Sequence, residues 1–209
     1  MYKPKQNKLV SFFFSWYISR IIHSDFHAFN FNKIDFDPNK AVLLLSNHFS
    51  WWDGFLMFQL NRLYFKKKFH IMITEENFKK VWFLKYLGSF SVKKGSRSSV
   101  ESLKFASELL DDPGNLLLIF PQGKLYSNLI TDVDFQRGIE HIIKSSQHNF
   151  QYLFSAVFVD YFNQRKPMAT CYLQKYMPEV EVDSSFKSLE AAFNAHYKTS
   201  HTQQISVTV

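Results

Sequence analysis

The chain has 209 residues, enough for one domain with a substantial core, and its single cysteine, Cys171, excludes an internal disulfide and a cysteine-based zinc cluster. Its 25 Lys and Arg residues against 18 Asp and Glu residues give a net charge of +7, which favours an anionic partner. Because the positive charge is scattered and matches no nucleic-acid-binding motif, we expect that partner to be a membrane surface or a phosphorylated substrate and not nucleic acid. The 6 glycines form neither G-x-G-x-x-G nor G-x-x-x-x-G-K-[ST], which argues against dinucleotide binding and P-loop phosphoryl transfer.

Residues 1–38 are predicted to be an N-terminal amphipathic helical segment with an aromatic face and basic flanks. Its apolar run, residues 9–22, contains three serines and an arginine, which makes it too short and too polar to span a bilayer. Phe and Trp on one face with basic flanks favour the headgroup region of a membrane. Packing of the same helix on the rest of the protein is an equally good interpretation.

Residues 39–209 are predicted to form an α/β domain. Apolar runs bounded by polar residues indicate strands, and the helical patterns between them indicate helices. The expected strands are 41–46, 68–74, 89–94, 115–123 and 152–162. The expected helices are 53–65, 76–88, 98–112, 137–146 and 187–199. Because strand and helix alternate, we expect a largely parallel central sheet flanked by helices.

Two polar segments follow strands of this sheet: "SNHFSWWDG" at 46–54 and "FPQGK" at 120–124. Active sites of parallel sheets form beyond the carboxyl ends of the strands, so both segments should lie on one rim. On a regular helix His48 and Asp53 would point about 140° apart, so they meet only if His48 lies in the loop and Asp53 in the first turn of the next helix. Asp53 would then hold one ring nitrogen and leave the other as a general base. Taken alone, a helix cap and a loop histidine explain the pair better than catalysis does.

Four blocks, in order, resemble the glycerolipid acyltransferase superfamily, which includes the 1-acyl-glycerol-3-phosphate (lysophosphatidate) acyltransferases. "NHFSWWD" is similar to the N-H-x-S-x-x-D block, and "GSFSVKKGSRSS" to the second block of the family. "LLIFPQGK" resembles the F-P-E-G-T-R block, and "DFQRGIEHII" the basic-residue–glycine helix start that follows it. The resemblance covers roughly residues 39–160.

The resemblance implies that His48, oriented by Asp53, deprotonates an acceptor hydroxyl that attacks the thioester of acyl-CoA or acyl-carrier protein, with no metal site and no bound cofactor. It implies an acceptor that is 1-acyl-glycerol-3-phosphate by default, and a peripheral or monotopic location among the lipids of the cytoplasmic face of the cell membrane. The residues expected from the blocks to bind substrate are Asn47, Ser50, Lys93, Lys94, Arg97, Pro121, Gln122, Gly123 and Lys124. One of the two tryptophans, Trp51 and Trp52, is expected to line the acyl channel and the other to pack the helix on the sheet.

The third block departs from the family pattern at three positions: Gln122 stands for glutamate, Lys124 for threonine and Leu125 for the arginine that helps to hold the acceptor phosphate. Lys124 or a basic residue of the second block could replace that charge, without the bidentate fork of arginine. The acceptor could therefore also be a lyso-aminolipid, a glycolipid or a pigment alcohol. Two other functions stay open: a catalytically silent, basic membrane-binding protein of the same fold, and a thioester hydrolase.

Overall fold

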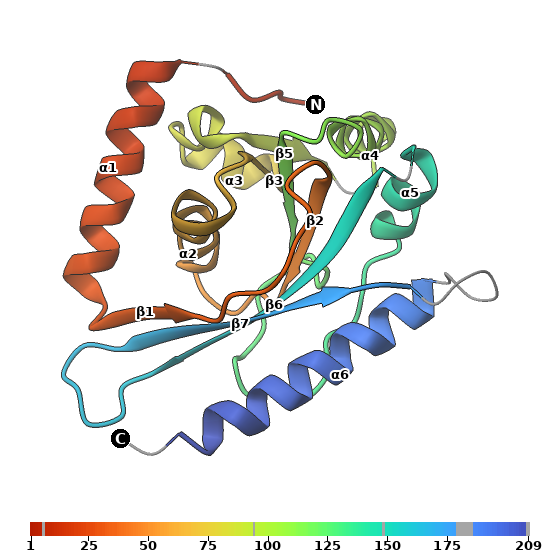
Figure 1. Ribbon diagram of the computed structural model, residues 1–209. Helices are drawn as coiled ribbons and strands as arrows, with labels where there is room; N and C mark the ends of the chain where they lie inside the picture. Colours follow the sequence, from red (N-terminus) through yellow and green to blue (C-terminus); the bar gives the residue numbers. More distant parts are fainter. Residues whose placement is uncertain (6, 94, 148, 179–185, 208–209) are drawn as a thin grey trace.

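The computed structural model describes residues 1–5, 7–93, 95–147, 149–178 and 186–207 (Figure 1). Within them, seven strands form one sheet in the order β1-β7-β6-β2-β5-β3-β4. Neighbouring strands are parallel except β6 and β7. The strands are β1 Ala28–Phe31, β2 Ala41–Ser46, β3 Lys68–Thr74, β4 Ser89–Val92, β5 Asn115–Ile119, β6 Phe150–Asp160 and β7 Met168–Tyr176. The predicted largely parallel α/β sheet is confirmed.

Helices cover both faces of this sheet (Figure 1). They are α1 Lys8–Asp25, α2 Asp53–Leu60, α3 Glu75–Lys80, α4 Arg97–Leu109, α5 Gly138–Ser145 and α6 Phe186–Ile205. A π-helical turn, η1 Asn61–Phe65, continues α2, and a 3-10 turn, η2 Leu84–Leu87, precedes β4. Gly88 ends η2 with a φ of 87°, a conformation that glycine adopts at little cost, and a Cβ there would stand 1.8 Å from the carbonyl oxygen of Phe69.

The single predicted helix over 76–88 is wrong, because the chain leaves the helix after Lys80 and turns before η2. The cause is a tertiary contact. The ring of Phe83 stacks on the ring of Phe14 in α1, with 4.4 Å between the centroids. Trp82 packs edge-on against the ring of Phe14, with 5.5 Å between the centroids. Packing against α1 therefore decides the path of this segment, against its local helical pattern.

Strand β2 shows how the core is divided. All six of its residues are buried, and successive side chains point to opposite faces. Val42 and Leu44 join an apolar cluster with residues of α1 and α2, whereas Leu43 and Leu45 join a second cluster with residues of α4, α5 and α6. Burial on both faces explains why the sequence of β2 is apolar without interruption.

Helix α1 has one buried and one exposed apolar face. Phe14, Ile18 and Ile22 are buried in the first cluster, so the helix packs on the sheet side that also carries α2. Five other side chains recur at helical spacing on the outer face and are 41–83% exposed; we call them the α1 stripe: Leu9, Phe12, Phe13, Trp16 and Tyr17. Among the described helices, none is long and apolar enough to cross a bilayer. The division of the chain at residue 38 stays a prediction.

Candidate active site

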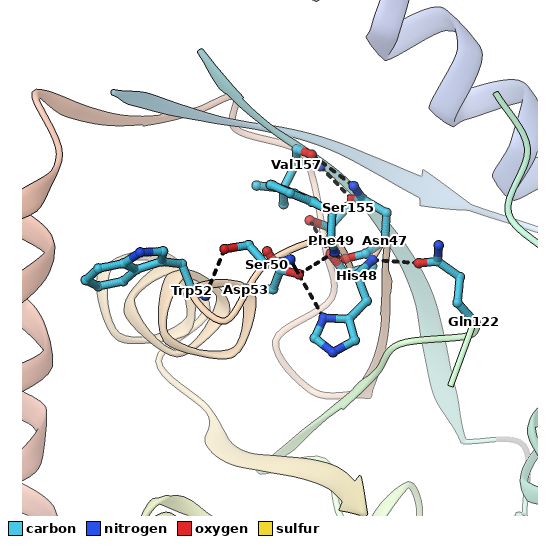
Figure 2. A network of polar contacts seen from close by, with 10 residues as sticks. Asn47, His48, Phe49, Ser50, Trp52, Asp53, Gln122, Ser155 and Val157 are labelled. Carbon is cyan, nitrogen blue, oxygen red and sulfur yellow. Dashed lines mark hydrogen bonds and ion pairs between the residues drawn. The ribbon is translucent and has the colours of Figure 1, made fainter. Parts of the chain in front are cut away.

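The loop after β2 brings His48 and Asp53 together, with His48 in the loop and Asp53 as the first residue of α2. The Nδ1 atom of His48 lies 2.8 Å from Oδ2 of Asp53 (Figure 2). The same oxygen accepts hydrogen bonds from the backbone N–H groups of Phe49, at 2.7 Å, and Ser50, at 2.8 Å. The bend required by the spacing of the two residues is therefore present, and three donors converge on one carboxylate oxygen.

Burial dominates the electrostatics of this pair. Asp53 is completely buried, and its burial raises the pKa of the carboxyl group, opposed by the hydrogen bonds from His48 and from the backbone. The other carboxylate oxygen, Oδ1, has no hydrogen-bond partner among the described residues. The His48 ring stacks on Phe120, with centroids 4.1 Å apart and an angle of 10° between the planes. Since Nδ1 is occupied and the ring is fixed, Nε2, which points away from Asp53 (Figure 2), is the nitrogen left for chemistry.

Two buried amide side chains fix the loop that carries His48. Asn47 donates from Nδ2 to the carbonyl oxygen of Val157, at 2.9 Å, and accepts from the Val157 N–H at 2.8 Å, which ties the loop to β6. Gln122 accepts the backbone N–H of His48 at 2.6 Å and so ties it to the turn after β5 (Figure 2). Neither side chain is among the described residues that line the adjacent pocket. The contact at position 122 needs one acceptor oxygen, and glutamine supplies it as well as glutamate does.

The remaining loop residues stabilise the same geometry. The hydroxyl of Ser50 accepts the N–H of Trp52 at 3.1 Å. Gly123, with a φ of 64°, makes the turn in which its N–H donates to the carbonyl oxygen of Phe120 at 3.0 Å. Pro121 is buried, and its carbonyl oxygen accepts the N–H of Gln136. Pro121 and Gly123 also line the pocket, whereas Ser50 is not among its described lining residues.

His48 stands on the wall of a pocket of about 840 Å³. Apolar side chains of α2, β3 and η2 line one part of it, among them Phe55, Phe58, Phe69, Leu84 and Leu87. Trp51, 61% exposed, also lines the pocket. Trp52 instead packs edge-on against Phe26, with 5.1 Å between the ring centroids. Trp51 thus lies at the pocket and Trp52 packs against the residue that ends α1, while an acyl channel beside Trp51 stays a prediction; the apolar part has the character of a ligand pocket.

The sequence profile of the Acyltransferase family matches residues 28–158, well over half of the chain. The chain belongs to the acyltransferase family. Its fold is similar to the crystal structure of the 1-acyl-sn-glycerophosphate (LPA) acyltransferase, PlsC, from Thermotoga maritima, with a TM-score of 0.66. That likeness covers 97% of this chain and 82% of the other at 17% sequence identity, which supports a common fold. A search of curated proteins found no match.

The basic residues expected at the site of this acyltransferase lie in different places. Lys124 is exposed and lines the pocket, and its Nζ stands 4.9 Å from the ring centroid of Tyr126. Lys93 is exposed and is not among the described lining residues. Lys94 and the side chain of Arg97 lie outside what the structure describes, and the backbone of Arg97 begins α4.

Arg137 was not among the residues predicted to bind substrate. Arg137 immediately precedes α5 and lines the pocket together with Gln136 and Lys124. The signal was present, because the sequence "QRG" matches the basic-residue–glycine helix start of the fourth block. What the sequence does not show is that the turn after β5 and the start of α5 lie side by side, joined by the hydrogen bond from the Gln136 N–H to the Pro121 carbonyl oxygen.

Proposed function

We propose that this acyltransferase moves a fatty acyl group from acyl-CoA or an acyl-carrier protein to the hydroxyl of a lipid-like acceptor. The observation that carries the proposal is the position of His48: Nδ1 is held by the buried carboxylate of Asp53, and the ring lies on the wall of an apolar pocket. A histidine so oriented is suited to act as a general base.

In the proposed reaction, Nε2 of His48 takes the proton of the acceptor hydroxyl as its oxygen attacks the thioester carbonyl. The carbon–sulfur bond then breaks, and the imidazolium returns the proton to the leaving thiolate. Asp53 stabilises the imidazolium between these steps and keeps the ring in place. No covalent enzyme intermediate is needed, and no step uses a metal or a bound cofactor. Holding the two substrates in line beside His48 supplies much of the rate.

The positive charge of residues that line the pocket favours an acceptor with a phosphate group, and 1-acyl-glycerol-3-phosphate is the first candidate. Leu125 stands where the family pattern has its phosphate-binding arginine. Lys124 and Arg137 line the pocket and supply two positive charges there. Arg137 in addition offers the planar fork that binds phosphate oxygens in pairs. A lyso-aminolipid, a glycolipid or a pigment alcohol would bind less strongly to these two cationic side chains.

We further propose that the protein binds peripherally to the cytoplasmic face of the membrane through the α1 stripe. Four of the five side chains of this stripe are aromatic, and Lys8 and Arg20 flank it on the same helix. Aromatic rings with basic neighbours suit the boundary between headgroups and acyl chains. A lipid acceptor would then be taken from the surface to which the enzyme is bound.

The test is thiol release from acyl-CoA and from acyl-carrier protein, with and without 1-acyl-glycerol-3-phosphate. We expect release that depends on the acceptor and falls by about two to four orders of magnitude in His48→Ala. Release without any acceptor would indicate the thioester hydrolase instead. Equally low release from wild type and His48→Ala with every acceptor, while vesicle binding persists, would indicate the catalytically silent membrane-binding protein.

A further inference from the structure

The hairpin of β6 and β7 ends in a turn, residues 161–167, which we call the hairpin tip. Its sequence is "YFNQRKP", with Tyr161 60% exposed and Phe162 36% exposed. Phe162 has a φ of 45°, which is uncommon for a bulky residue and costs conformational energy. A hydrogen bond from the Gln164 N–H to the Tyr161 carbonyl oxygen, at 2.8 Å, closes the turn. The tip thus presents two adjacent aromatic residues at a strained turn.

The tip projects beyond the rim that carries His48. Strand β6 runs parallel to β2, and Ser155 pairs with Ser46 at the end of β2. From there β6 continues to Asp160, about 16 Å further at the rise of an extended strand. The segment between them includes Val157, to which Asn47 ties the catalytic loop. The tip is therefore rigidly connected to the loop of the candidate active site.

The tip also lies beside the end of α1. The N–H of His27, two residues after the end of α1, donates to the carbonyl oxygen of Pro167 at 2.8 Å. Ala28 then pairs with Met168 as β1 joins the sheet. In Figure 1 the turn between β6 and β7 and the lower end of α1 lie at the same side of the molecule. The hairpin tip therefore lies beside the C-terminal end of the helix whose N-terminal half carries the α1 stripe.

The positive charge of the tip is complementary to the negative charge of an anionic lipid surface. Arg165 and Lys166 follow the aromatic pair, and no residue of 161–167 is acidic. Asp160, just before the tip, accepts a hydrogen bond from Nε2 of Gln204 at 2.6 Å. Aromatic rings beside cations are the composition of segments that bind at the headgroup boundary.

We infer that the hairpin tip is a second membrane contact, which acts with the α1 stripe to set the angle at which the His48 rim meets an anionic bilayer. The α1 stripe spans only residues 9–17, so as a single contact it leaves the protein free to tilt about that short segment. A second contact, fixed to β6 and to the catalytic loop, removes that freedom. The inference rests on the proposed function, which requires a lipid surface, and adds the orientation of the enzyme on it.

The experiment measures binding of the full chain to phosphatidylcholine vesicles with and without phosphatidylserine. The test variant is Tyr161→Ser with Phe162→Asn, because asparagine tolerates a positive φ and should leave the melting temperature equal or higher. We expect its affinity for vesicles to fall about tenfold. Arg165→Gln with Lys166→Gln should lose affinity by about tenfold only where phosphatidylserine is present. The matched control is Met177→Ser, 73% exposed next to the opposite end of β7, which should bind as wild type does.

Wild-type affinity in the aromatic tip variant, or no binding of wild type to either vesicle, would overturn the inference. So would a loss of affinity in Met177→Ser as large as that of the tip variant, since the effect would then not belong to the tip. Binding is read without turnover, so this result is separate from the proposed function. A protein that binds vesicles through the tip but releases no thiol with any acceptor would contradict the proposed reaction and leave the second contact standing.

Discussion

Asp53 holds His48 at 2.8 Å while the carboxylate is completely buried, with two backbone N–H groups as its other donors. Burying the carboxylate of Asp53 positions His48 for its proposed role as a general base, but it lowers the free energy of unfolding. Burial raises the pKa of Asp53, so the ionised carboxylate is less favourable in the folded chain than in the unfolded one. Above the raised pKa the fold carries this cost in full, and the cost shrinks as the pH falls from there toward the ordinary value of 3.8.

Asp53→Asn should therefore separate activity from stability. The amide oxygen can still accept the N–H groups of Phe49 and Ser50, and no charge is buried, so we expect an equal or higher melting temperature at neutral pH. That difference should shrink as the pH falls, because wild-type Asp53 becomes protonated. Thiol release should fall by about two orders of magnitude or more, since a neutral amide stabilises the imidazolium poorly. A clear drop in melting temperature at neutral pH would contradict this account.

Gln122 should be replaceable by glutamate but not by leucine. Its Oε1 accepts the His48 N–H at 2.6 Å, and glutamate offers the same acceptor. Gln122→Leu leaves that N–H without its partner and should cost about 1–3 kcal/mol of unfolding free energy, with slower thiol release as His48 loses its position. Gln122→Glu should keep thiol release near that of wild type, but because position 122 is 2% exposed its charge should lower the free energy of unfolding at neutral pH, and that loss should shrink as the pH falls. Urea unfolding and the release assay check the pair, and equal damage from both variants would show that the amide nitrogen matters instead.

The pair of His48 and Asp53 could be predicted from the sequence because five residues and one strand–loop–helix bend fix its geometry. The parallel sheet was predictable for a similar reason, since strands such as β2 are buried on both faces and read as uninterrupted apolar runs. Each of these features is local in the chain.

Features that depend on distant contacts could not be predicted. Strand β1 has only four residues and exists as a strand because it pairs with β7, far away in sequence. Strand β7 has mixed polarity and is fixed by its antiparallel partner β6. That Lys124 and Arg137 line the same pocket likewise depends on how the turn after β5 lies against α5.

The α1 stripe should dominate membrane affinity. Phe12→Ser, Phe13→Ser and Trp16→Ser together remove exposed rings, so sedimentation with anionic vesicles should show a loss of about tenfold or more. These substitutions are preferable to deleting residues 1–22, which would also remove Phe14, Ile18 and Ile22 from the core. Val100→Ser is the control, since it is 55% exposed on α4, on the other side of the molecule (Figure 1). Unchanged sedimentation of the triple variant would leave α1 as a packing helix.

Lys124 and Arg137 should contribute to binding of the acceptor and not to binding of the acyl donor. Lys124→Ala and Arg137→Ala should each raise the KM for 1-acyl-glycerol-3-phosphate by about tenfold, with the KM for acyl-CoA little changed. Arg137→Lys should recover only part of the loss, because lysine lacks the fork. Lys144→Ala, on α5 but paired with Glu140 on the surface, serves as the control. If both KM values rise together, the two cations bind the donor phosphates instead.

His70 should make the fold sensitive to acid. The side chain is buried in β3, with Nε2 3.3 Å from Oδ1 of Asn115, and its burial lowers the pKa of His70 from 6.5 to about 4. Because the unfolded chain binds the proton more tightly, stability is fully present above pH 6.5 and is lost as the pH falls toward 4. The loss from this residue should reach about 3 kcal/mol.

Urea unfolding measured between pH 6.5 and pH 4 checks the sign and the size of this loss of unfolding free energy. His70→Gln can keep a hydrogen bond to Asn115 without binding a proton, so its stability should vary much less with pH than that of wild type. Part of the slope should persist, because burial also lowers the pKa of His196. His23→Gln, on the exposed side of α1, should leave the wild-type slope unchanged. If His70→Gln follows the wild-type curve, acid sensitivity arises elsewhere and His70 is protonated in the folded chain without penalty.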